Sequence, residues 1–172
     1  MDTERLSGKK ALITGGAQGM GAAIAKHWAA QGAAVCVADI NEEGIAKVAQ
    51  EIRDAGGQAT HFTLDVTDED QMQHFFAQVT ERFAGVDIFI SNAGTGGPAG
   101  PLDELQYDAW QACLSVNLNG AFLGARWASE MMRAQGAGVI LFMSSSSGLH
   151  GVPMRSPYVA AKWGLIGLTK TL

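Results

Sequence analysis

A glycine-rich turn between an apolar segment and a helical one is the feature that most constrains this chain. Residues 11–13 are apolar and too few for a helix, so they predict a short buried strand. Four glycines follow closely: Gly15, Gly16, Gly19 and Gly21. A helical pattern then runs to Gly32. Free N–H groups and the helix dipole converge on such a turn, which predicts a phosphate-binding site. Glycines also serve plain tight turns, so the turn alone leaves both interpretations open.

Composition restricts the class of protein. A chain of 172 residues that is 47% hydrophobic and 17% charged predicts one globular domain, residues 1–172. The net charge of −5 without a basic cluster argues against nucleic acid or an anionic membrane as a partner. Residues 1–8 lack the apolar core of a signal peptide, so we expect a cytoplasmic protein. Cys36 and Cys113 lie in apolar runs, which indicates reduced thiols, and no metal site is predicted.

Apolar runs alternate with helical patterns along the chain. Five runs predict buried strands: residues 11–13, 33–38, 59–64, 86–91 and 139–143. The alternation favours an α/β fold with a parallel sheet, and the less apolar third run is expected near a sheet edge. A long helical stretch is predicted over residues 103–135, with a break near Tyr107. An earlier helical pattern ends by Gly85, and Thr67 and Asp70 fit a capping box at its start.

Tyr158 and Lys162 are four residues apart in the last helical pattern, so their side chains share a face. An ammonium group near a phenol favours the phenolate and lowers the phenol's pKa from about 10 toward neutrality. Such a tyrosine can serve as acid or base in the interconversion of an alcohol and a carbonyl. A single pair at this spacing is more often an ordinary surface contact, so other residues must support the interpretation.

Seven motifs occur in an order and spacing that resemble the short-chain dehydrogenase/reductase family, from about Gly8 to the end. They are Thr14-Gly15-x3-Gly19-x-Gly21, Asp39, Asp65-Val66, Asn92-Ala93-Gly94, Asn117, the serines 144–147, and Tyr158-x3-Lys162. The resemblance implies a Rossmann-type doubly wound parallel sheet in three α/β/α layers. It also implies NAD(P)-dependent oxidation of an alcohol or reduction of a ketone, with a small-molecule substrate and a homodimer or homotetramer as the assembly.

The same resemblance implies four catalytic residues. Tyr158 would be the acid/base, and Lys162 would lower its pKa and bind the nicotinamide ribose. Ser145 would hydrogen-bond the substrate oxygen, because the family serine stands 13 residues before the tyrosine. Asn117 would hold a water that links Lys162 to solvent.

The implied cofactor site is larger. It comprises Gly15, Gln18, Gly19, Met20, Gly21, Asp39, Ile40, Asp65, Val66, Asn92, Ala93, Gly94, Tyr158 and Lys162. Asp39 can accept hydrogen bonds from ribose hydroxyls but repels a 2′-phosphate. NADP-preferring relatives usually carry a basic residue where this chain has Gln18 or Ile40, so NAD is the expected cofactor. Asp39 or Asn41 could instead cap the next helix, and Asn41 is the better cap.

The sequence identifies the substrate site less clearly than the cofactor site. Residues 95–100 and 149–157 are expected to line its site, with His150, Met154 and Trp163 as candidate contacts. Structural roles for these three side chains explain their presence equally well.

The family continues beyond the last helix with further strands that this sequence does not contain. In the family order 3-2-1-4-5-6-7, residues 139–143 therefore become an outer strand, apolar on both faces and without charge or proline. We expect a chain that ends at Leu172 to aggregate, or to need a partner or the absent segment. It would be either a fragment of an active dehydrogenase or an incomplete chain that at most binds nucleotide.

Overall fold

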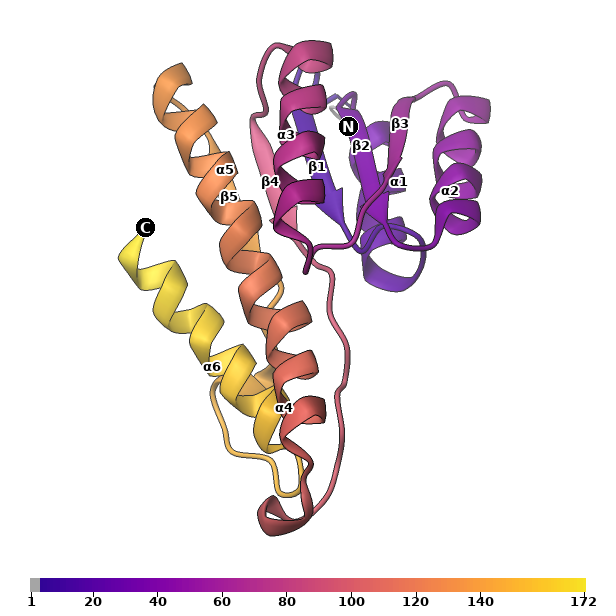
Figure 1. The fold of residues 1–172 in the computed structure, drawn as a ribbon. Coiled ribbons are helices and arrows are strands. Elements are labelled where there is room, and N and C mark those ends of the chain that lie inside the picture. The colour runs from indigo at the N-terminus through magenta and orange to yellow at the C-terminus, as the bar shows by residue number, and fades with distance from the viewer. Residues whose placement is uncertain (1–3) are drawn as a thin grey trace.

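A five-stranded parallel sheet forms the centre of the molecule in the computed structural model, which describes residues 4–172 (Figure 1). The strands are β1 (Lys10–Thr14), β2 (Ala34–Asp39), β3 (Gln58–Thr63), β4 (Ile88–Ser91) and β5 (Val139–Phe142). Their order is β3-β2-β1-β4-β5, and all four neighbouring pairs are parallel. The predicted parallel sheet and its five strands are thus confirmed. The first three residues of the predicted domain lie outside the described part.

Helices connect the strands. They are α1 (Gly19–Ala30), α2 (Glu42–Asp54), α3 (Glu69–Phe83), α4 (Tyr107–Leu114), α5 (Gly120–Gln135) and α6 (Ser156–Thr171). Short 3₁₀ helices cover Leu102–Glu104 (η1) and Ser146–Gly148 (η3), and the π-helical segment Ser115–Asn119 (η2) joins α4 to α5. Figure 1 shows α4 and α5 running on as one long rod. The predicted break near Tyr107 is confirmed, whereas the π-helical segment was not predicted.

The two faces of the sheet bury separate hydrophobic clusters. Alternate side chains of β1 point to opposite faces, so Leu12 joins one cluster and Ile13 the other. The Leu12 cluster includes residues of α3 and α5, and the Ile13 cluster includes residues of α1 and α2. The sheet therefore lies between two helical layers, as a three-layer α/β/α fold requires.

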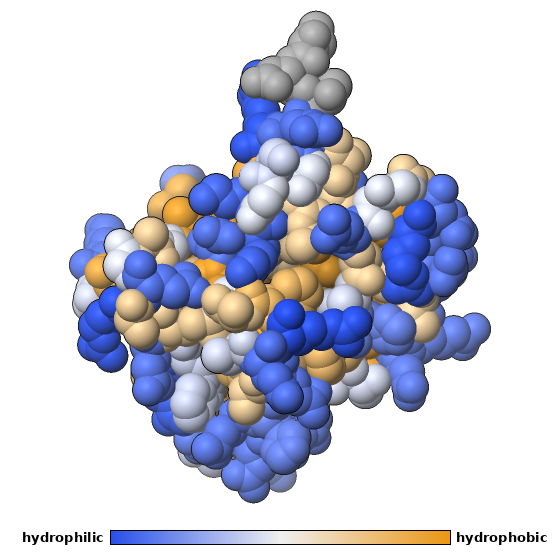
Figure 2. Space-filling view, turned by 90° about the horizontal axis from the view of Figure 1, so that it is seen from above, coloured by the Kyte–Doolittle hydropathy of each residue, from blue (hydrophilic) through white to orange (hydrophobic). Residues whose placement is uncertain are grey.

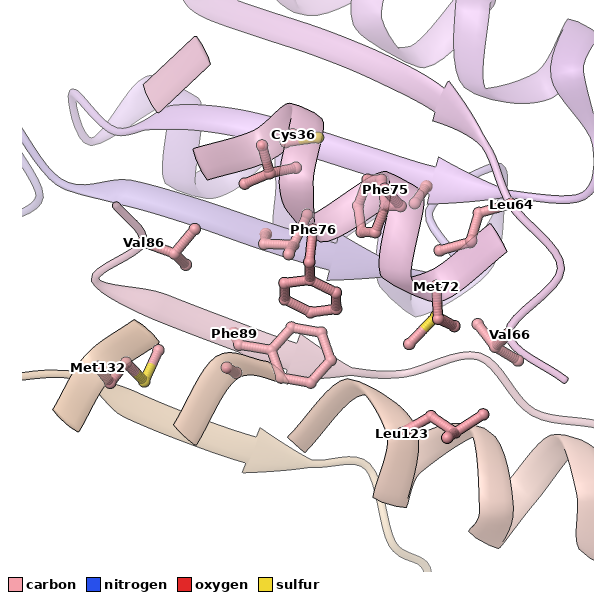
Figure 3. Packing of buried hydrophobic residues seen from close by; sticks show 14 residues of the cluster. Cys36, Leu64, Val66, Met72, Phe75, Phe76, Val86, Phe89, Leu123 and Met132 are labelled. Carbon is pink, nitrogen blue, oxygen red and sulfur yellow. The ribbon is translucent and has the colours of Figure 1, made fainter. Parts of the chain in front are cut away.

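Aromatic rings form the centre of the Leu12 cluster. Phe62, Phe75, Phe76 and Phe89 contact one another edge to face in sequence, with centroid separations of 5.4, 5.4 and 5.8 Å. Figure 3 shows the Phe76 ring beside that of Phe89, between α3 and β4. Gly124 of α5 faces the Phe89 ring so closely that a Cβ atom there would lie 2.9 Å from Cε1. This contact lets α5 lie tightly against the strand.

The outer strands differ in character. β3 is at one edge of the sheet, as its lower apolar content predicted. β5 is at the other edge of the sheet formed by residues 4–172, which confirms its predicted outer position. On β5, Val139 and Leu141 are 52% and 41% exposed. The alternation shows that one face of this strand is covered less completely than the other.

One predicted helix cap is wrong and another is confirmed. Helix α3 is capped by Asp68, whose carboxylate accepts a hydrogen bond from Gln71 N at 3.0 Å. Thr67 lies one residue before this N-cap, and its N–H and hydroxyl both donate to Asp65 Oδ1. At α2, Asn41 Oδ1 accepts from Gly44 N at 3.0 Å, as predicted. The Asp39 carboxylate is therefore not used as the cap of α2.

The face of the molecule seen in Figure 2 carries both hydrophilic and hydrophobic groups. In Figure 2, hydrophobic groups lie toward the middle of the visible face and hydrophilic ones around its periphery. No helix in residues 4–172 combines the length and hydrophobicity needed to cross a bilayer. The same residues contain no cluster of three or more His, Cys, Asp or Glu side chains with the geometry of a metal site.

The aromatic cluster predicts a specific loss of stability. Phe89 is fully buried, so Phe89→Ala should lower the free energy of unfolding by about 3–5 kcal/mol through lost burial and the cavity left behind. Phe122→Ala is the matched control, because that ring is 48% exposed and should cost less than about 1 kcal/mol. Urea unfolding of both variants measures the difference, and similar losses at the two positions would contradict the assignment of the core.

Candidate functional site

The ends of β1 and β4 are joined by a compact set of hydrogen bonds. Thr14 Oγ1 accepts from Asn92 N at 3.1 Å and from Ala93 N at 3.3 Å. In return, Asn92 Nδ2 donates to the carbonyl oxygens of Thr14 and Gly15, at 3.1 and 2.9 Å. The glycine turn and the segment after β4 are therefore held in one fixed arrangement at the carboxyl edge of the sheet.

Two glycines make this approach sterically possible. A Cβ atom at Gly15 would lie 2.7 Å from Ala93 Cα, and the φ angle of Gly15 is +66°. A Cβ atom at Gly21 would overlap Gly15 O and lie 2.7 Å from Asn92 Nδ2. Gln18, the N-cap of α1, makes no side-chain capping bond, and the first turn of α1 has no acidic residue. The N-terminus of α1 thus has the geometry and charge of an anion-binding site.

Beside this turn lies a cavity of about 400 Å³. Ten of the predicted cofactor-binding residues line it: Gly15, Gln18, Met20, Asp39, Ile40, Asp65, Val66, Asn92, Ala93 and Gly94. The other four do not line the cavity: Gly19 and Gly21 begin α1 beside it, and Tyr158 and Lys162 lie on α6. Leu64 and Val116 also line it and were not predicted. Each directly precedes a predicted residue, Asp65 or Asn117, which is the signal that could have identified them.

The Asp39 carboxylate lies at the rim of this cavity. Its Oδ2 accepts from Ala17 N at 3.2 Å, and its Oδ1 accepts from Asn41 N at 3.1 Å. Asp65, also on the cavity wall, is held by the two bonds from Thr67. Two oriented carboxylates thus face a cavity that lies beside an anion-binding turn.

Tyr158 and Lys162 project together from α6, as the spacing predicted. Lys162 Nζ lies 5.5 Å from the centroid of the Tyr158 ring and donates to Met143 O at 2.8 Å. Lys162 is only 5% exposed, and this burial lowers the pKa of its ammonium group because desolvation disfavours the charged form. The ammonium is therefore held in place by the end of β5 and by its own helix.

Asn117 is oriented by the π-helical segment. It is 1% exposed, and its Nδ2 donates to Thr95 O at 2.8 Å and Cys113 O at 2.9 Å. A Cβ atom at Gly94 would lie 2.9 Å from Asn117 Oδ1 and 3.6 Å from Lys162 Nζ. Asn117 and Lys162 therefore meet at Gly94, a residue of the cavity wall. The predicted catalytic residues and the predicted cofactor site are adjacent.

Two of the four consecutive serines, Ser144 and Ser145, make different contacts. Ser144 Oγ donates to Lys162 O at 3.0 Å, which ties the end of β5 to α6. Ser145 is the N-cap of η3, and its Oγ accepts from Ser147 N at 3.1 Å. The Ser145 hydroxyl hydrogen remains available for a further acceptor. Ser144 has a structural contact, so Ser145 is the better candidate for substrate binding, as the resemblance implied.

The candidate substrate-binding side chains are exposed. Met154 is 56% exposed and Trp163 is 49% exposed, and His150 is also exposed. His150 and Met154 lie in the loop between η3 and α6, and Trp163 lies in α6. Their exposure leaves both the binding and the structural interpretation open.

Several known proteins share the fold of this chain. Levodione reductase from Leifsonia aquatica is 35% identical over 170 residues, which cover 98% of this chain and 64% of the reductase. The crystal structure of NAD⁺-bound xylitol dehydrogenase is 30% identical and has a TM-score of 0.95, covering 98% of this chain and 65% of that one. A metagenomic short-chain oxidoreductase in complex with NADP is 35% identical, with a TM-score of 0.93 over 96% of this chain and 75% of that one.

This chain therefore spans 64% of the length of the levodione reductase that it resembles. Relatives with the same fold bind NAD in one structure and NADP in another. Residues 9–172 match the family described as short chain dehydrogenase. A match over nearly the whole sequence shows that the chain belongs to this family of oxidoreductases.

Proposed function

We propose that this protein interconverts a secondary alcohol and a ketone with NAD as the cofactor. The observation that carries the proposal is the meeting of Asn117 and Lys162 at Gly94, on the wall of the cavity beside the glycine turn. This contact brings the Tyr158–Lys162 pair next to the cavity that would hold a dinucleotide. An ordinary surface pair on a helix would have no such neighbour.

The residues present fit a dinucleotide. The glycine turn is open at Gly19, where a Cβ atom would meet nothing within 4 Å, so a pyrophosphate could approach the backbone there. The N-terminus of α1 favours its negative charge. Asp39 and Asp65 offer carboxylate acceptors along the cavity wall. When bound, NAD supplies the group that accepts or donates the hydride. The chain itself supplies binding, orientation and proton transfer.

Tyr158 is the proposed acid/base. Its hydroxyl would donate a proton to the carbonyl oxygen of a ketone, or accept one from the hydroxyl of an alcohol. The Lys162 ammonium, 5.5 Å from the ring centroid, would stabilise the negative charge left on the tyrosine oxygen. Ser145 would donate a hydrogen bond to the substrate oxygen. Asn117 would fix the segment around Thr95 and, through a water, connect Lys162 to solvent.

We also infer a preference for NAD over NADP. The Asp39 carboxylate is fixed at the cavity by the N–H groups of Ala17 and Asn41. A 2′-phosphate placed against it would bring two negative charges together, whereas ribose hydroxyls would donate to it. Gln18 and Ile40, the nearby side chains on the cavity wall, carry no positive charge to offset that repulsion.

Cofactor choice should depend on Asp39. Titration of the protein with NAD and with NADP should give tighter binding of NAD. In Asp39→Ala the ratio of the two dissociation constants should fall about tenfold, which corresponds to about 1.4 kcal/mol. Glu42→Ala removes the same charge from the first turn of α2, away from the cavity lining, and should leave the ratio unchanged. Equal affinity of the unmodified protein for both cofactors would refute the preference.

Turnover should depend on Tyr158. Tyr158→Phe should lower kcat by about 10²–10⁴-fold, because only the proton donor is removed, and NAD affinity should remain close to normal. The chain has one other tyrosine, Tyr107, which is 71% exposed, so Tyr107→Phe is the control. Absorbance of NADH with a panel of alcohols and ketones measures turnover. If Tyr158→Phe retained most of the activity, another residue would have to be the acid/base.

Cofactor binding should depend on the close approach at Gly21. Gly21→Ala should displace the turn from Asn92 and weaken NAD binding at least about tenfold, at a cost in stability of about 1–3 kcal/mol. Gly167→Ala is the matched control, because a Cβ atom there meets nothing within 4 Å. That change in α6 should leave NAD binding unchanged and should not destabilise the protein. Calorimetric titration and thermal unfolding compare the two variants.

A further inference from the structure

Arg155 occupies an unusual position beside Tyr158. It directly precedes α6, and its Cζ lies 5.5 Å from the centroid of the Tyr158 ring. Its Nη2 donates to Gly96 O at 2.6 Å, in the loop between β4 and η1. The guanidinium is therefore fixed between the proposed acid/base and one of the two loops expected to line the substrate.

The backbone on both sides is arranged around this side chain. Gly100 N donates to Met154 O at 2.9 Å, so the two loops are tied together next to Arg155. Met154 itself has a φ angle of +64°, a conformation that costs energy for a residue with a side chain. A Cβ atom at Gly96 would lie 2.9 Å from Arg155 Nη2, so glycine allows the guanidinium its place. The bond between the loops, the backbone conformation of Met154 and the glycine at position 96 all lie around the Arg155 side chain.

The charge of Arg155 has no counter-ion within the described chain. Guanidinium offers five N–H donors, and within residues 4–172 its bond to Gly96 O is the only hydrogen bond found for it. The three ion pairs found among those residues involve other side chains. Neither residues 143–158, which contain Arg155, nor residues 93–101, which include its partner Gly96, contain Asp or Glu. The guanidinium therefore has no ion-pair partner among residues 4–172, although the chain carries a net charge of −5.

We propose that Arg155 is a specificity-determining residue that binds a carboxylate on the substrate. The substrates would then be hydroxy acids and oxo acids, with the carboxylate on Arg155 and the reacting oxygen at Tyr158 and Ser145. A guanidinium fork matches a carboxylate in two parallel hydrogen bonds, and its free donors here suit one such group. This inference rests on the proposed function, because it names the substrate class of the same site.

Matched pairs of substrates test the inference. Short-chain oxo acids and their methyl esters differ in charge but share the keto group. The ratio of kcat/KM for acid over ester should fall about 10–100-fold in Arg155→Gln, mainly through KM, since a charge-assisted hydrogen bond contributes about 1.5–3 kcal/mol. Arg155→Lys, which keeps the charge but not the fork, should give an intermediate ratio. Arg133→Gln removes an exposed positive charge from the end of α5 and should leave the ratio unchanged.

Other outcomes would overturn it. If Arg155→Gln lowered the acid and the ester equally and shifted the pH profile of kcat, Arg155 would act through Tyr158 or the loop. An unchanged ratio would show that Arg155 does not contact the substrate. Ligand-observed NMR of butanoate with the NAD-saturated protein gives a readout without turnover. Butanoate binding that is lost in Arg155→Gln supports the inference even if no ketone is reduced, and equal binding by both proteins refutes it.

Discussion

The close approach of the glycine turn to the segment after β4 is the contact on which the rest of the structure depends. Four hydrogen bonds cross it: two join Thr14 and Asn92, one runs from Asn92 Nδ2 to Gly15 O, and one runs from Ala93 N to Thr14 Oγ1. Gly21 leaves no space for a Cβ atom. The contact fixes the distance between the central strands at their carboxyl ends. It also forms the cavity wall, because Gly15 and Asn92 both line the cavity. The most constrained part of the fold and the proposed cofactor site are therefore the same place.

The π-helical segment between α4 and α5 has a comparable double role. Its wider turn places Val116 on the cavity wall and turns Asn117 inward to Thr95 and Cys113. Such single-turn π-helical distortions within α-helices occur frequently at functional sites. Burial raises the pKa of the Cys113 thiol, so the neutral thiol serves as a packing and hydrogen-bonding partner of Asn117. The π-helical segment thus places one residue on the cavity wall and buries the next one beside it.

Much of the fold could be predicted from the sequence, because strands buried on both faces leave continuous apolar runs. Motif spacing also predicted most of the cavity wall, since those residues lie at strand ends. The cap of α3 could not be predicted reliably, because Thr67 and Asp68 are neighbouring residues of types that both cap helices well. The π-helical segment could not be predicted, because five residues leave no periodic pattern in the sequence that distinguishes them from an α-helix. The position of the Arg155 guanidinium could not be predicted, because it depends on a hydrogen bond to Gly96, which lies 59 residues away in the chain.

Charges of opposite sign occupy different parts of the site. Asp39 and Asp65 line the cavity beside the glycine turn, whereas Lys162 and Arg155 each lie 5.5 Å from the centroid of the Tyr158 ring. Two cations near one ring repel each other, and burial already lowers the pKa of Lys162. A negatively charged group between Lys162 and Arg155 would reduce this electrostatic repulsion. If a substrate carboxylate pairs with Arg155, the charge of Lys162 remains for the tyrosine oxygen. The two cations would then have separate tasks, one selecting the substrate and the other supporting proton transfer.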